Sequence, residues 1–162
     1  MLKKQITYFI ILICFVGSFS TLYGQQKRKI TFEYSGFLDK NEDKYPGATV
    51  FTRDDSQQVH IVHEGVNMWC DQAVHYKDQD FVEAYGNVRI VQGDTITMTS
   101  KYVKYSGQTK LAFASGDVIL REPSSTLSTD TLYFDRVKQQ AYYRSHGKVV
   151  KDSSGVITSK IG

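Results

Sequence analysis

Apolar and polar residues alternate along much of the chain after residue 60, and the same arrangement returns at a nearly fixed interval. Gly-x-Val phrases begin at Gly86, Gly116 and Gly147, at intervals of 30 and 31 residues. Each phrase has a small residue two positions earlier, at Ala84, Ala114 and Ser145. Since side chains alternate between the two faces of a strand, this pattern predicts β-structure built from a repeated unit.

A second phrase lies between these and indicates that each unit contains two extended arms. One column of this phrase is large and apolar, and comprises Met68, Met98, Leu127 and Ile157. A column two residues later is small, and comprises Cys70, Ser100, Thr129 and Ser159. We expect first arms at 68–76, 98–105 and 127–134, and second arms at 81–91, 110–120 and 141–150. Turn-forming residues separate the arms, and no helical periodicity is present after the N-terminal segment.

The two arms differ in how regularly their apolar residues alternate. In the second arm, one face is apolar and small, with Val82, Ala84, Gly86, Val88 and Ile90 in one unit and Ala112, Ala114, Gly116, Val118 and Leu120 in the next. In the first arm, the apolar residues change face near Asp71, Lys101 and Asp130. One extra residue at each of these positions restores the alternation, which predicts a β-bulge or a sharp bend. The pattern therefore predicts sheets folded over each other and close together at one side.

The N-terminal segment has a different composition from the repeats. Lys3 and Lys4 precede an apolar run over 6–19, which is typical of a secretory signal peptide and short for a membrane-spanning helix. We expect a signal peptide over 1–24 and an exported domain over 25–162, with an uncleaved anchor as the alternative. The exported domain keeps one cysteine, Cys70, which excludes an internal disulfide. Loss of the two lysines lowers the formal net charge from +3 to +1, which provides no electrostatic basis for binding nucleic acid.

The segment from His63 to Met98 resembles the OstA-like proteins of the LptA superfamily. The shared features are the Cys70-Asp71 step, the Ala-x-Gly-x-Val phrase over 84–88 and the Gly-Asp-Thr turn over 93–95. The next unit keeps the phrase over 114–118, whereas the third unit has Ser145 in place of alanine and lysines within its apolar run. The resemblance covers roughly residues 29–161, and its motifs are short.

This resemblance implies an all-β fold, a repeat-built open β-jellyroll of folded, twisted antiparallel sheets. It also implies a periplasmic, non-enzymatic protein of the cell envelope, without cofactor or metal, that carries lipopolysaccharide toward the outer membrane. The implied partners are the lipid A acyl chains, held in an apolar trough, and other Lpt-type β-jellyroll proteins, joined head to tail through terminal strands. We expect the inward side chains of the arms to line the trough, namely Met68, Val82, Ala84, Val88, Ile90, Met98, Ala112, Ala114, Val118, Leu120, Leu127 and Val149.

Two other interpretations of the repeat remain open. The inward residues are also compatible with a dry sandwich, that is, a structural or adhesive repeat module with a sealed core. A carbohydrate-active β-solenoid is disfavoured, because it requires acidic residues on one outward face, whereas Asp71, Lys101 and Asp130 alternate in sign. The fourth unit is incomplete at Gly162, which predicts either a truncated chain, the favoured interpretation, or a terminal strand paired by a partner.

Few residues suggest other chemistry. His60 and His63 are three residues apart, so they lie on opposite faces of a strand and cannot readily share one metal ion. Exposure on the strand is the expected state of both histidines. Cys70 shares its column with serine and threonine, which favours a small packed side chain over a reactive thiol. Trp69 is expected to cover a face of the sheet.

Overall fold

The computed structural model describes residues 29–152 and 155–162, so the predicted signal peptide lies outside the described residues. The described residues form antiparallel strands and one 3₁₀ turn, η1 (Lys77–Gln79), which confirms the all-β prediction. The strands are β1 (Thr31–Tyr34), β2 (Phe37–Asp39), β3 (Thr49–Thr52), β4 (Val59–His63), β5 (Val66–Cys70), β6 (Gln72–Tyr76), β7 (Phe81–Gln92), β8 (Ile96–Ser106), β9 (Leu111–Glu122), β10 (Ser125–Asp135), β11 (Gln140–Tyr142), β12 (Gly147–Lys151) and β13 (Gly155–Ser159).

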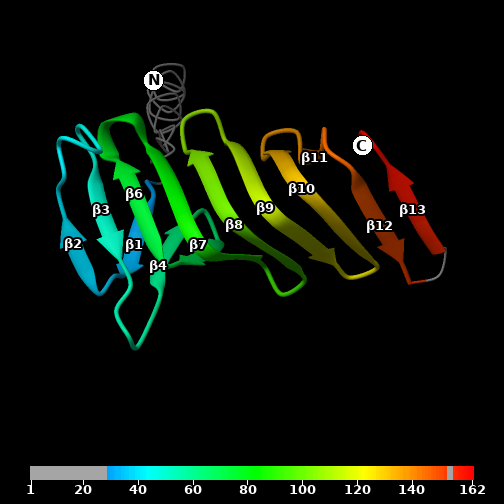
Figure 1. Ribbon diagram of the computed structural model, residues 1–162, viewed down its shortest axis with the longest axis horizontal. Helices are drawn as coiled ribbons and strands as arrows, with labels where there is room; N and C mark the ends of the chain where they lie inside the picture. Colours follow the sequence, from blue (N-terminus) through cyan, green and yellow to red (C-terminus); the bar gives the residue numbers. More distant parts are fainter. Residues whose placement is uncertain (1–28, 153–154) are drawn as a thin grey trace, which may run out of the picture.

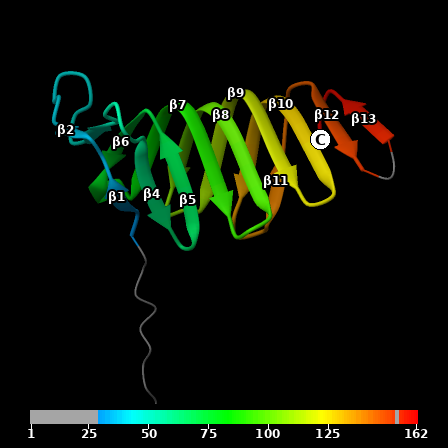
Figure 2. The ribbon, with the colours of Figure 1, turned by 90° about the horizontal axis from the view of Figure 1, so that it is seen from below.

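Backbone pairing divides these strands into two layers that meet along a bend (Figure 1, Figure 2). Layer A comprises β2, β3, β6 and β11, with residues 81–85 of β7, 102–106 of β8, 111–115 of β9 and 131–135 of β10. Layer B comprises β1, β4, β5, β12 and β13, with the remaining halves of β7 to β10. Among the described residues, β1 pairs only with β4 and β13 only with β12, so the sheet stays open. This confirms the open β-jellyroll that the family resemblance implied.

The bend lies where the change of face in the first arm predicts it. Asp71 separates β5 from β6, and the register shifts between Thr99 and Tyr102 in β8 and between Thr129 and Thr131 in β10. Polar side chains hold the bend together, since the Asp71 carboxylate accepts hydrogen bonds from Asn87 Nδ2 at 2.6 Å and Gln58 Nε2 at 3.0 Å. The predicted bulges of the first arm are thus confirmed.

The second arm also bends, which its regular alternation does not predict. In β7 the register shifts between Tyr85 and Val88, and the two intervening residues both have positive φ, 73° at Gly86 and 44° at Asn87. A Cβ at Gly86 would lie 2.6 Å from the Asp71 carboxylate, so glycine lets the two arms approach at the bend. The repeated Gly-x-Val phrase therefore marks the fold line of the sheet.

The third unit differs from the other two. Its second arm, expected to be continuous over 141–150, is interrupted, and β11 and β12 are separated by residues 143–146. The Ser145 hydroxyl lies 3.0 Å from Thr129 Oγ1 and accepts a hydrogen bond from the Thr131 backbone N–H at 3.1 Å. A side chain thus takes the place of backbone pairing, at the position where the earlier units have alanine.

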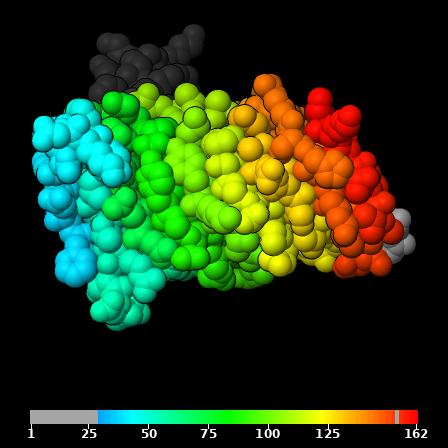
Figure 3. Space-filling view, in the orientation of Figure 1, coloured from blue at the N-terminus to red at the C-terminus, as the bar shows by residue number. Residues whose placement is uncertain are grey.

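The core runs between the layers and links each unit to its neighbours. Along the long axis, segments follow one another in chain order, so each unit packs mainly on the adjacent units (Figure 3). Buried side chains from both layers form one cluster that includes Val59, Val82, Val88, Val103 and Val118. As in other repeat proteins, one unit cannot cover its own apolar face, and stacking provides that cover.

Candidate functional site

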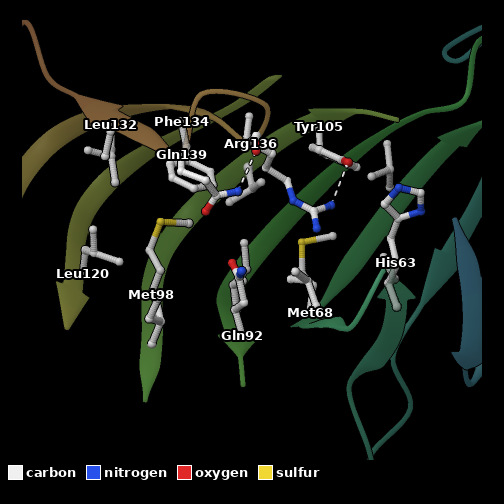
Figure 4. A pocket seen from close by; sticks show the side chains of 18 of the residues that line it. His63, Met68, Gln92, Met98, Tyr105, Leu120, Leu132, Phe134, Arg136 and Gln139 are labelled. Atoms are coloured by element: carbon white, nitrogen blue, oxygen red, sulfur yellow. Dashed lines mark hydrogen bonds between the residues drawn. The ribbon is translucent and has the colours of Figure 1, made fainter. Parts of the chain in front are cut away.

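An apolar cavity of about 230 Å³ lies between the layers, on the side away from the bend (Figure 4). Layer B provides one wall with Met68, Met98 and Leu120, and layer A provides the facing wall with Leu132 and Phe134. Further lining residues are Ile30, Ile61, His63, Val66, Val82, Ile90, Gln92, Ile96, Val103, Tyr105, Ala112, Glu122, Arg136, Gln139 and Ala141. The site is therefore an apolar slot with few polar groups, which suits alkyl chains better than polar substrates.

One row of apolar side chains crosses layer B from the cavity to its last strand. Its members are direct cross-strand partners and share one face: Ile61, Met68, Ile90, Met98, Leu120, Leu127, Val149 and Ile157. Met68 is buried, whereas Ile157 is 56% exposed. Layer A ends at β11, so the end of this row that lies on β13 is open. The cavity thus continues into an apolar surface that spans successive repeats.

Six of the twelve expected trough residues line the cavity. These six are Met68, Val82, Ile90, Met98, Ala112 and Leu120. Four others, Ala84, Val88, Ala114 and Val118, are buried beside the bend, where the layers are in contact. Leu127 packs against the core and its cross-strand partner Val149 is half-buried, and neither lines the cavity. The inner face is therefore sealed along the bend and hollow at its free edges.

Several lining residues were missed from the sequence. Tyr105, Leu132 and Phe134 belong to the halves of the first arms that follow the bulge. The change of face at the bulge was the signal that could have identified them, since it brings these positions inward. Arg136 and Gln139 lie in the turn after β10, and a turn residue carries no periodic signal.

Charged side chains from three turns meet at the edge of the cavity. Glu64, between β4 and β5, accepts a hydrogen bond at Oε1 from Lys110 Nζ at 2.7 Å. Its Oε2 lies 3.4 Å from Arg136 Nη1, which also donates to the Tyr105 hydroxyl at 3.0 Å. His63 Nε2 lies 3.1 Å from Lys110 Nζ. We call Glu64, Lys110 and Arg136 the ionic cluster; it joins the free edge of layer B to that of layer A.

The surroundings set the charges of this group. The hydrogen bond from Lys110 lowers the pKa of Glu64, so that carboxyl is ionised at neutral pH. Burial of the imidazole lowers the pKa of His63, and the nearby Lys110 charge adds to this effect. His63 is therefore neutral at neutral pH, and its buried position contradicts the expectation of an exposed strand histidine.

The other residues singled out from the sequence have structural surroundings. Cys70 is fully buried, and burial raises the pKa of its thiol to about 12, as a packed side chain requires. His60 stacks on Trp69 with ring centroids 4.7 Å apart, and Arg89 covers the same indole at 5.0 Å. No group of three potential metal ligands occurs among residues 29–152 and 155–162. In that part of the chain, no helix has the length and apolar character needed to cross a membrane.

Comparison with known proteins gives the family. A family model described as OstA-like protein matches residues 27–162. The chain belongs to the OstA-like family. This OstA-like chain is similar in fold to LptH of Pseudomonas aeruginosa, with 12% sequence identity and a TM-score of 0.59. The match covers 71% of this chain and 81% of LptH, whose structure is described as the LptA-homologous periplasmic component of the conserved lipopolysaccharide transport device. A search of curated proteins found no match to this OstA-like protein.

Proposed function

We propose that this protein is a non-enzymatic, periplasmic carrier of lipopolysaccharide, which holds lipid A acyl chains against the apolar inner face of its β-jellyroll. The observation that carries the proposal is the unbroken apolar row across layer B, which leads from the cavity at Met68 to the open strand at Ile157. The family and the LptH-like fold support the same function.

Transfer free energies explain why such a lipid needs an apolar row. Transfer of an acyl chain of about twelve carbons from an apolar site into water costs roughly 10 kcal/mol of free energy, at ~0.8 kcal/mol per methylene. Similar side chains on successive strands present similar surfaces, so a chain can shift along the row without leaving apolar contact. Repetition then supplies a path for the lipid as well as a core for the fold.

Photo-crosslinking to purified lipopolysaccharide tests this function. A photoreactive amino acid at Met98 or Leu120, both in the cavity wall, is expected to crosslink to the lipid. The matched control is the same amino acid at Thr99, the neighbour of Met98 on the opposite face of β8. No labelling at Met98, together with a melting temperature that lipid leaves unchanged, contradicts the proposal and favours the sealed structural module.

Terminal strands are the proposed contacts with other β-jellyroll proteins. Among the described residues, the outer edge of β13 has no strand partner, and Val156 and Ile157 are 57% and 56% exposed. The edge strand of layer A at the N-terminal side is β2, in which Phe37 and Leu38 are 65% and 63% exposed. An unpaired edge with apolar side chains is suited to strand addition by a second subunit.

Disruption of β13 tests this association. Replacing Thr158 by proline, which removes a backbone donor, is expected to reduce the assembly seen by analytical ultracentrifugation of the purified protein. Val137→Asp, at an exposed position in the turn after β10, is the control and is expected to leave assembly intact. Equal assembly of Thr158→Pro and the unmodified protein contradicts strand addition at β13.

A further inference from the structure

The ionic cluster has more positive than negative charge. Lys110 and Arg136 are cations, Glu64 is the one anion of the cluster, and His63 beside them is neutral. Within the described residues, no other carboxylate forms an ion pair with either cation. One positive charge is therefore left without a paired anion at this edge of the cavity, since the other lining carboxylate, Glu122, accepts a hydrogen bond from Ser125 and forms no ion pair with either cation.

Both cations are poorly solvated. The side chains of Lys110 and Arg136 are 22% and 16% exposed, whereas Lys101 and Lys138 on the surface are 72% and 70% exposed. A charge removed from water requires a partner or hydrogen bonds, and its interaction with an anion strengthens as the surroundings become less polar. Lys110 and Arg136 are therefore expected to bind an anion more strongly than the lysines of the outer surface.

Arg136 is aimed into the cavity. Figure 4 shows its guanidinium between the walls, with Met68 on one side and Tyr105 on the other. Its turn is fixed by a hydrogen bond from Gln139 Nε2 to the Arg136 carbonyl, at 2.6 Å. Its contacts to Glu64 and Tyr105 both use Nη1, so among the described residues the donors on Nε and Nη2 are not used in these contacts.

The position of Glu64 allows a bound anion to displace its carboxylate from the cluster. It lies at the tip of the β4–β5 hairpin with a φ of 49°, its side chain is 33% exposed, and Gly65 follows it. Because Glu64 lies outside both strands and its side chain is partly exposed, water can reach the carboxylate at the hairpin tip. Its carboxylate keeps the two cations from being unpaired when the site is empty, which would otherwise be costly.

We propose that Lys110 and Arg136 bind the anionic head group of the amphiphile whose alkyl chains occupy the cavity, and that the head group displaces the built-in counter-ion Glu64. This inference rests on the proposed function, because it assigns a second recognition element to the same cavity. The ligand class is an alkyl chain that carries a phosphate or carboxylate. A guanidinium binds such oxyanions through two parallel hydrogen bonds, while the lysine adds a point charge.

Ligands of equal chain length and different head groups test the inference. Calorimetric titration of the purified protein with dodecyl phosphate, dodecyl maltoside and dodecyltrimethylammonium separates the head group from the chain. We expect dodecyl phosphate to bind about tenfold more tightly than the maltoside, the size of one charge-assisted hydrogen bond. The ammonium ligand is expected to bind most weakly, and inorganic phosphate alone is expected to show no measurable binding.

Variants of the cluster show whether this preference arises there. Lys110→Gln combined with Arg136→Gln is expected to reduce the ratio of the affinities for dodecyl phosphate and dodecyl maltoside, both measured in the same variant, to about twofold or less. Glu64→Gln is expected to raise the affinity for dodecyl phosphate several-fold, because no internal anion competes. Lys138→Gln, on an exposed lysine outside the cavity, is the control and keeps the original preference.

Each outcome supports or overturns the inference. Equal binding of the three dodecyl ligands by the unmodified protein overturns head-group recognition and leaves alkyl binding intact. Binding of none of them contradicts the proposed function itself. If the double variant does not fold, the unmodified protein and Glu64→Gln decide, since a phosphate preference that Glu64→Gln leaves unchanged also overturns the displacement. Tight binding of inorganic phosphate assigns the cations to a free anion instead.

Discussion

The same alternating pattern produces two regions of the inner face, one beside the bend and one at the free edges. These two regions differ in function. Beside the bend, Ala84 meets Ala73 and Val118 meets Thr129 across the strands, and all four are buried. At the free edges, larger side chains such as Met98 and Phe134 face each other across a cavity. The two layers diverge from the bend, so small residues fill the narrow side and even large residues leave space at the wide side.

This difference assigns stability and binding to different residues. Changes beside the bend act on a packed core, in which added or removed volume is poorly tolerated. Changes at the cavity act on a surface with room to adjust. We therefore compare residues of one region with matched residues of the other, from the largest expected effect to the smallest.

Thiol labelling is expected to show the largest contrast. In a chain with Cys14→Ser, Cys70 has a pKa raised to about 12 by burial, which lowers its thiolate fraction by about three orders of magnitude relative to an exposed cysteine. A Met98→Cys variant that also carries Cys70→Ser places the thiol in the cavity wall, and we expect it to react at least a hundred times faster. Reaction rates with a chromogenic disulfide reagent measure both, and equal rates contradict a sealed bend.

Added volume separates the two regions by stability. Ala84→Leu places three extra carbons where no space exists, and we expect a loss of about 3 kcal/mol in unfolding free energy. Ala112→Leu adds the same atoms at the cavity wall, and a loss below about 1 kcal/mol is expected. Urea unfolding followed by tryptophan fluorescence measures both values. Losses of the same size mean that the cavity is as tightly packed as the bend.

Glycines at the bend and at a free turn differ by the space around them. Gly116 has a φ of 79°, and a Cβ there would lie 2.8 Å from the Lys101 Cβ, so Gly116→Ala should cost about 2 kcal/mol. Gly93 has a φ of 58°, and a Cβ there would meet no atom within 4 Å, so Gly93→Ala should cost about 1 kcal/mol. Denaturant midpoints of the two variants test this, and a larger cost at Gly93 contradicts the close approach at the bend.

The pH dependence of stability is expected to show the smallest effect. Burial lowers the pKa of His63 below its unfolded value of about 6.5, so the unfolded chain binds more protons in that range. The contribution of neutral His63 to the unfolding free energy is therefore fully present above about pH 6.5. It is lost as the pH falls toward the lowered folded-state pKa. In His63→Gln, a smaller loss between pH 8 and pH 5.5 is expected. Burial also lowers the pKa of His75. Because His75 is unchanged in this variant, its contribution to the pH dependence remains.

Melting temperatures across this pH range measure the histidine effect. The control is His60→Gln, on the outer side of β4, where the imidazole stacks on Trp69. An unchanged pH profile in His63→Gln shows that burial of this imidazole does not contribute to the loss of stability in acid.

Much of the fold could be predicted because it depends on local alternation. The first arms and their bulges at Lys101 and Asp130 follow from changes in parity, and the structure has them at those positions. The bulge at Gly86 and the break at Ser145 could not be predicted in the same way. Both depend on contacts with a neighbouring arm, the Asp71 carboxylate in one case and Thr129 and Thr131 in the other.

The cavity was predicted less completely than the fold. The expected inward residues do face inward, but the alternation gave Ala84 and Met98 equal weight, although only Met98 borders the open space. The ionic cluster was not predicted, because Glu64, Lys110 and Arg136 lie in three turns, with 46 residues from the first to the second and 26 from the second to the third. Turn residues have no periodicity, and their meeting depends on how the two layers close over each other.

The sequence by itself determined which side chains face inward, at what period the unit repeats and where its first arms bend, because each depends only on near neighbours along the chain. The tertiary structure decided which part of the inner face is sealed, which part is hollow, and which charges lie at its edge. Those properties depend on the separation between two layers, and that separation is set by packing between residues far apart in the sequence.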